Sequence, residues 1–134
     1  MRSFISLGAF AVGVDIAPLH KSPYVLYGNA LKIQFGENSV DYVFTNIIDH
    51  ISDIDAFARE VFRVLKPQGK FLSEVQIQDR KNDPWAVRST GSTDFFKMYD
   101  NLLSSYGLTK CTTKAKYKGG WVNSLWVKGK CEPY

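Results

Sequence analysis

The sequence predicts an α/β fold in which a mostly parallel sheet ends in an antiparallel pair of strands. Short apolar runs alternate with stretches of helical periodicity along most of the chain. The run Val40–Thr45 is nearly all apolar after Asp41, as expected for a parallel strand buried at the centre of a sheet. Two later strand-like segments are joined by Gly119-Gly120, a connection short enough to make them antiparallel neighbours.

The bulk properties predict one ordinary globular domain over residues 1–134. The chain has 134 residues, 45% of them hydrophobic and 22% charged, which is usual for a soluble protein. No apolar run is long enough to span a membrane, and the first residues lack a signal-peptide pattern. We therefore expect a soluble intracellular protein without a membrane span, with the cytoplasm as its favoured compartment.

The cysteines and lysines carry two further expectations. Cys111 and Cys131 lack metal-ligand spacing, so we expect no metal site and two free thiols, which could pair only if their strands were adjacent. The net charge is +4, and the excess lies late in the chain. Its lysines predict a solvated strand face or, as the alternative, a nucleic-acid patch. They are Lys110, Lys114, Lys116, Lys118, Lys128 and Lys130.

The first elements are short. We expect a helix over Phe4–Phe10 that leads into a strand at Ala11–Asp15. A second strand, Tyr24–Tyr27, ends at Gly28-Asn29, and Val40–Thr45 forms the third.

A helix over Asp53–Leu65 follows, because its apolar residues recur on one face. Ser52 and Asp55 suggest a capping box, and Pro67 ends the helix. Lys70–Ile77 is then a strand with alternate apolar residues.

A polar loop over 78–91 contains Pro84 and Trp85. Ser92 is the expected N-cap of a helix through Tyr106, with Gly107 after its C-terminus. Two closing strands follow, at about 108–117 and 121–128.

Four of these segments together resemble a known family. Asp15 after its strand, Gly28–Leu31, Ser39–Asn46 and Glu60–Gly69 occur in the order and spacing found in class I S-adenosylmethionine-dependent methyltransferases, most closely the type 11 group. The resemblance implies a Rossmann-like, three-layer fold and methyl transfer from S-adenosylmethionine to a small-molecule or lipid acceptor. The family's first strand and its glycine-rich loop have no counterpart in Met1–Phe10, so the resemblance implies an N-terminally truncated domain.

The resemblance also assigns roles at the carboxyl ends of the strands. It makes Asp15 the acceptor for the ribose hydroxyls of the cofactor, although Asp is also a good turn former. It gives Asn29 the bond to the adenine amino group, with a turn-favouring Asn as the alternative. Ala30 and Leu31 would contact the adenine ring. The residues implied to bind the cofactor are Asp15, Ile16, Gly28, Asn29, Ala30, Leu31 and Asn46.

Asp49 and His50 follow Asn46 in the loop before the helix. Either could act as the general base if the acceptor is a hydroxyl. The alternative is that Asp49 or Asp53 only caps the helix and that His50 is an exposed loop residue.

Three functions therefore remain open. The first is a methyltransferase. The second is a catalytically inactive, methyltransferase-like interaction domain that self-associates through the sheet edge left by the absent strand. The third is a nucleic-acid-associated protein that uses the late lysines.

Overall fold

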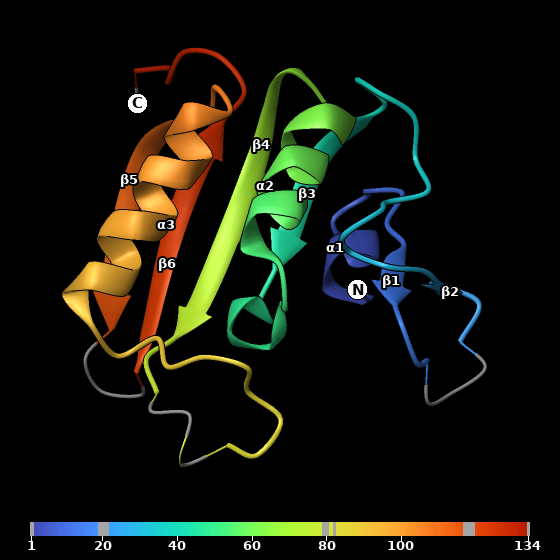
Figure 1. The fold of residues 1–134 in the computed structure, drawn as a ribbon. Helices are drawn as coiled ribbons and strands as arrows, with labels where there is room; N and C mark the ends of the chain where they lie inside the picture. Colours follow the sequence, from blue (N-terminus) through green and yellow to red (C-terminus); the bar gives the residue numbers. More distant parts are fainter. Residues whose placement is uncertain (1, 19–21, 79–80, 82, 117–119, 134) are drawn as a thin grey trace.

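The computed structural model describes residues 2–18, 22–78, 81, 83–116 and 120–133 (Figure 1). The first half contains α1 (Arg2–Ser6), β1 (Gly13–Asp15), β2 (Val25–Tyr27), β3 (Val40–Thr45) and the 3-10 turn η1 (Ile48–His50). The second half contains α2 (Ile54–Val64), β4 (Leu65–Gln76), α3 (Thr93–Ser105), β5 (Thr109–Lys116) and β6 (Trp121–Val127). Gly119, in the expected turn between β5 and β6, lies outside the described residues, as do residues 79–80 and 82 of the polar loop.

The described strands form two sheets. β1 and β2 pair in parallel, and the larger sheet has the order β3-β4-β6-β5. β3 and β4 are parallel, whereas β6 is antiparallel to both β4 and β5. The expected α/β class with a closing antiparallel pair is confirmed. Among the described strands, β1 and β3 each pair on one side only, so the two sheets remain separate.

The helices are unevenly distributed over the larger sheet. Figure 1 shows α2 and α3 on the same face of it. On the opposite face, the ring of Phe4 in α1 packs against Phe44 of β3, with 5.8 Å between ring centroids. Phe44 pairs in register with Leu72, and these two side chains remain 43% and 39% exposed. The expected three layers are present, but within the described residues the third is thin.

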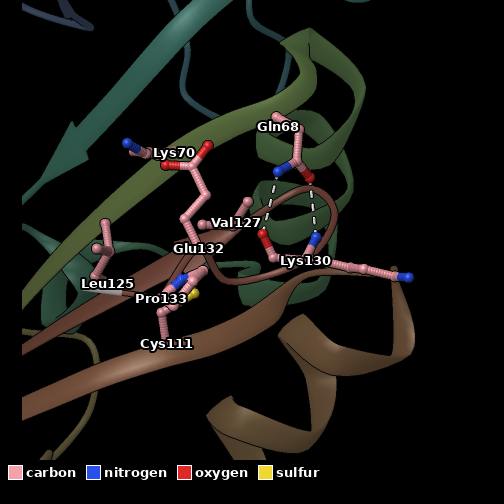
Figure 2. A pocket seen from close by; sticks show the side chains of 8 residues that line it. All are labelled: Gln68, Lys70, Cys111, Leu125, Val127, Lys130, Glu132 and Pro133. Carbon is pink, nitrogen blue, oxygen red and sulfur yellow. Dashed lines mark hydrogen bonds between the residues drawn. The ribbon is translucent and has the colours of Figure 1, made fainter.

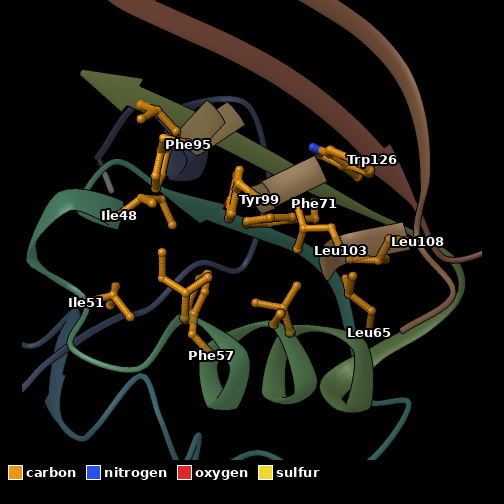
Figure 3. Packing of buried hydrophobic residues seen from close by; sticks show 14 residues of the cluster. Ile48, Ile51, Phe57, Leu65, Phe71, Phe95, Tyr99, Leu103, Leu108 and Trp126 are labelled. Carbon is orange, nitrogen blue, oxygen red and sulfur yellow. The ribbon is translucent and has the colours of Figure 1, made fainter. Parts of the chain in front are cut away.

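The core lies between the larger sheet and the two longer helices (Figure 3). Phe71 from β4 and Trp126 from β6 are fully buried beneath Tyr99 of α3. The Tyr99 hydroxyl bonds the Ser73 hydroxyl at 2.9 Å, which gives two buried polar groups a partner. Burial raises the pKa of Tyr99 well above its usual range. This core holds the ends of β3 and β4 in place.

Caps set the starts of the two longer helices. Asp53 is the N-cap of α2, and its carboxylate accepts a hydrogen bond from Ala56 N at 2.9 Å. The capping box expected from Ser52 is therefore wrong by one residue, because the Asp53 carboxylate both bonds that amide and carries charge at the positive end of the helix. Ser92 caps α3 as expected, accepting from Phe95 N at 3.1 Å.

Cys111 and Cys131 form a disulfide, with 5.5 Å between their Cα atoms. The expectation of two free thiols is therefore wrong. The reason is that β5 and β6 are adjacent and the chain bends at residues 128–129 after β6, which brings Cys131 back beside Cys111 at the register shift in β5. The bond joins the C-terminal segment to the edge strand β5.

Candidate functional site

The carboxyl ends of β1 and β2 meet as the sequence predicts. The two strands are parallel and in register from Gly13 with Val25 to Asp15 with Tyr27. Gly28 N then donates to the carbonyl oxygen of Asp15 at 2.9 Å. Figure 1 shows β1 and β3 pointing towards the same, lower side of the view. Ligands bind at this end of parallel sheets.

Asp15 is exposed at this edge. Its Oδ1 accepts a hydrogen bond from Ala17 N at 2.8 Å, which makes it a turn former. No hydrogen bond or ion pair is found for Oδ2 within the described residues. The turn therefore occupies one carboxylate oxygen and leaves the other available to a ligand hydroxyl.

Gly28 stands where no larger residue fits. A Cβ atom there would lie 2.7 Å from Cγ1 of Val14 and still closer to Oε1 of Gln34. Gln34 is itself held by its Nε2, which donates to Tyr27 O at 3.2 Å. Close packing of the backbone around the end of β2 accounts for a glycine here.

Asn29 lies at the same edge, but its amide oxygen is engaged. Oδ1 accepts from Leu31 N at 2.8 Å, which is an Asx turn. Ala30 and Leu31 are partly buried and pack against the core, whereas Ile16 is exposed. The Asx turn and the contacts with the core therefore both fix the backbone at Ala30 and Leu31.

A charged network joins this segment to α2, and sequence reasoning assigned it no role. Arg63 donates to Glu60 through Nε and Nη2, both at 2.8 Å. Arg63 also donates to the carbonyl oxygens of Phe35 at 2.9 Å and Ile33 at 2.8 Å. Ile33 N donates to Glu60 Oε2 at 2.8 Å. The pair anchors the segment that follows Leu31 onto the larger sheet's helix layer.

The same network shifts the ionisation of its members. The hydrogen bond from Arg63 holds the pKa of Glu60 below its ordinary value, against the opposing effect of burial. The hydrogen bond to Glu60 likewise raises the pKa of Arg63. Both groups are therefore charged around neutral pH.

Asn46, directly after β3, is exposed, and η1 then carries Asp49 and His50. Asp49 is only 2% exposed, and Asp53 is the cap of α2, so Asp49 does not cap that helix. Nε2 of His50 lies 3.2 Å from Oδ2 of Asp49 and 3.5 Å from Oδ2 of Asp83. Sequence reasoning missed Asp83, because nothing local in the polar loop indicates that it returns to η1.

Two cavities in the described structure lie elsewhere. One of about 60 Å³ is lined by Cys111, Lys130 and Pro133 among others, and Figure 2 shows Gln68 bonded across it to the backbone of Lys130. The other, of about 210 Å³, is lined by Asp41, Tyr42, residues 66–70 and Glu132, near the starts of β3 and β4. Both are smaller than usual ligand pockets of about 300–1,000 Å³. Neither is lined by a residue predicted to bind the cofactor.

Two of the late lysines have structural partners. Lys110 Nζ pairs with Asp100 at 2.5 Å and lies over the Trp126 ring. Lys128 Nζ donates to the carbonyl oxygens of Phe62 and Leu65 near the C-terminus of α2, and desolvation lowers its pKa. Lys118 lies outside the described residues. The internal contacts of Lys110 and Lys128 weaken the nucleic-acid alternative.

The family comparison covers the segments that carry the resemblance. A family model described as "Methyltransferase domain" matches residues 3–73, more than half of the chain. This range includes both short strands, β3, α2 and most of β4.

Two curated proteins are similar in sequence. The ubiquinone/menaquinone biosynthesis C-methyltransferase of Rickettsia prowazekii is 33% identical over 95 residues, which cover 69% of this chain and 35% of that protein. Phosphoethanolamine N-methyltransferase 2 of Caenorhabditis elegans is 37% identical over 73 residues, covering 51% of this chain and 17% of that protein. The matches thus span about a third of the first relative and a sixth of the second.

Solved structures share the fold. A methyltransferase of Haloferax volcanii, solved in complex with the Trm112 methyltransferase activator, matches 96% of this chain and 77% of its own with a TM-score of 0.77 and 15% identity. A possible histamine N-methyltransferase of Thermotoga maritima matches 95% of this chain and 76% of its own with a TM-score of 0.68 and 15% identity.

In the described part of the chain, no helix has both the length and the apolar character needed to cross a bilayer.

Proposed function

Because this chain belongs to the methyltransferase-domain family, we propose that it serves S-adenosylmethionine-dependent methyl transfer to a small-molecule or lipid acceptor. The observation that carries the proposal is the junction of Asp15 and Gly28 at the carboxyl ends of two parallel strands. The names of the two curated relatives, one for quinone biosynthesis and one for phosphoethanolamine, support the acceptor class.

The residues present fit the adenosine half of the cofactor. Asp15 would accept hydrogen bonds from the ribose hydroxyls through Oδ2, and the exposed position of its side chain leaves room for them. Ile16, Ala30 and Leu31 would border the adenine ring. Asn29 would bond the adenine through its amide group only if Oδ1 accepted a second bond beside that from Leu31 N.

The residues present do not fit the methionine half. The family resemblance places a glycine-rich turn there, and Met1–Phe10 contains none. We therefore expect residues 1–134 alone to bind S-adenosylmethionine weakly and to turn over little.

The protein's contribution to methyl transfer is mainly alignment and exclusion of water. When bound, S-adenosylmethionine supplies a methyl group that is already activated as a sulfonium. Asn46 would border the reacting end at the tip of β3. Asp49 or His50 would take the proton of a hydroxyl acceptor; for His50 this role falls to the ring nitrogen other than Nε2, because Nε2 faces two carboxylates.

The test is an NMR titration of the isotope-labelled chain with S-adenosylmethionine, which detects weak binding. Amide shifts should cluster at residues 15–17 and 28–31, and Asp15→Ala should reduce the affinity. Asp41→Ala, which removes an exposed Asp whose one ion-pair partner among the described residues is Lys66, is the matched control. Shifts confined to another surface, or an unchanged dissociation constant in Asp15→Ala, would contradict the proposed site.

The open strand edges favour a second candidate, an inactive domain that self-associates. β1 and β3 each carry an unpaired edge among the described strands, and such edges pair readily with other chains. Analytical ultracentrifugation distinguishes the two. A dimer that forms at micromolar concentration without cofactor, together with no shifts in the titration, would favour the interaction domain.

A further inference from the structure

Three side chains of metal-ligand type meet beside η1. The ligand atoms of Asp49, His50 and Asp83 all lie within 4.8 Å of one another. They come from two segments: η1 and the turn after residue 82. One imidazole nitrogen of His50 therefore faces two carboxylates. That of Asp49 is adjacent in sequence, and that of Asp83 comes from a distant loop.

Two of the three separations between ligand atoms suit a small divalent ion, and the third, between the two carboxylates, is within 4.8 Å. Bonds of about 2.0–2.1 Å from Zn²⁺ to nitrogen or oxygen separate neighbouring ligand atoms in a tetrahedral site by about 3.3–3.4 Å. The two separations around Nε2 of His50 are 3.2 Å and 3.5 Å. The second is long for a hydrogen bond between nitrogen and oxygen. A hydrogen bond therefore explains only one of the two contacts well.

The carboxylates are held in orientation by other groups. Nε2 of Gln78 donates to Oδ2 of Asp49, the same oxygen that faces His50, so this bond orients the carboxylate and leaves one lone pair of that oxygen for an ion. Val87 N donates to the backbone oxygen of Asp49 at 2.9 Å. Trp85 N donates to Oδ1 of Asp83 at 2.8 Å, and Oδ2 of that carboxylate faces His50.

The site is also accessible. Asp49 is buried, but the side chains of His50 and Asp83 are 38% and 24% exposed. An ion could enter from that side and keep at least one position for water or another oxygen ligand.

We propose that Asp49, His50 and Asp83 bind one divalent cation of the Zn²⁺ type. The mixed set of one imidazole and two carboxylates favours this class over Mg²⁺, which prefers oxygen ligands alone. The sequence-based expectation of no metal site rested on the spacing of the two cysteines. The cysteines are not part of this cluster, so their spacing does not bear on it. The proposal does not depend on methyl transfer, since it concerns binding of the metal alone, and while the ion is bound these side chains are ligands and not the general base.

The experiment is calorimetric titration of ZnCl₂ into untagged, metal-free chain with the disulfide intact, so that no thiolate competes. We expect one site per chain, affinity for Mg²⁺ that is much weaker, and at least about a tenfold loss in His50→Ala and in Asp83→Asn. His20→Ala is the matched control, because it removes the chain's other histidine.

Circular dichroism of each variant shows whether it is folded. Asp83 is chosen for replacement because its side chain is partly exposed, so the variant should still fold. In the wild-type chain, the imidazole NMR signals of His50 should shift on addition of Zn²⁺, a readout that needs no variant. Absence of saturable binding, or equal affinity in folded His50→Ala, would overturn the proposal and leave His50 as a hydrogen-bonded residue between two carboxylates.

Discussion

Replacing Arg63 should test how the segment that follows Leu31 is held against α2. Arg63→Met keeps most of the aliphatic length but removes four hydrogen bonds: two to Glu60 and one each to Ile33 O and Phe35 O. Among the described residues, Glu60 then retains the bond from Ile33 N alone, although its side chain is only 11% exposed.

The expected cost lies between two limits. Removing one partner of a fully buried ion pair costs about 3–5 kcal/mol, whereas exposed pairs contribute about 0–1 kcal/mol. The Arg63 side chain is 28% exposed, so water can reach part of the space it leaves. We therefore expect Arg63→Met to lower the free energy of unfolding by about 2–4 kcal/mol.

Urea denaturation followed by circular dichroism measures this loss. Arg59→Met is the matched control, since Arg59 is exposed on the same helix, and it should change stability by less than about 0.5 kcal/mol. A double-mutant cycle with Glu60→Gln should show that the two losses are not additive. A loss below about 1 kcal/mol in Arg63→Met, equal to that of the control, would refute the anchoring role.

Three further changes have defined outcomes. The folded-state pKa of Glu60 lies below its ordinary value of 4.5. The contribution of Glu60 to stability is therefore present above pH 4.5 and is lost as the pH falls through the folded-state pKa. The urea midpoint should drop on acidification, and it should drop less in Glu60→Gln. Reducing the disulfide of Cys111 and Cys131, 20 residues apart, should cost about 3 kcal/mol in the same assay, and a thiol assay of the native chain should find no free thiol. Gly28→Ala should lower the free energy of unfolding by about 1–3 kcal/mol, because the added Cβ meets Val14. Gly36→Ala, with open space around it, should be nearly neutral. Equal melting temperatures for the two variants would count against tight packing at Gly28.

Elements with strong local signals were predicted well. β3 matches its expected residues, and α3 begins at the expected Ser92 cap. In both, the pattern depends on residues a few positions apart, which is the range over which helical and strand periodicity act. The expected central, buried position of β3 is wrong, because among the described strands β3 is an edge strand of the larger sheet and Tyr42 is 68% exposed. The one-residue error at the start of α2 arose because Ser52 and Asp53 are both good caps, and only backbone geometry selects between them.

The candidate site was predicted less completely. The position of Asp15 beside Gly28 follows from two parallel strands ending together. The bonds from Ala17 N to Asp15 and from Leu31 N to Asn29 are local turns that the alternative interpretations had included. The cofactor roles of these residues stay predictions.

The sequence by itself determined the order of helices and strands, the family, and which polar residues follow the strands. The tertiary structure decided which distant groups meet: Glu60 with Ile33, Asp83 with His50, and Cys111 with Cys131. Local structure depends on propensities and hydrogen bonds between near neighbours, so it can be recognised in a short window of sequence. Contacts across 20 residues or more depend on strand register, on the path of loops and on packing against a shared core, and these result from the whole chain folding together.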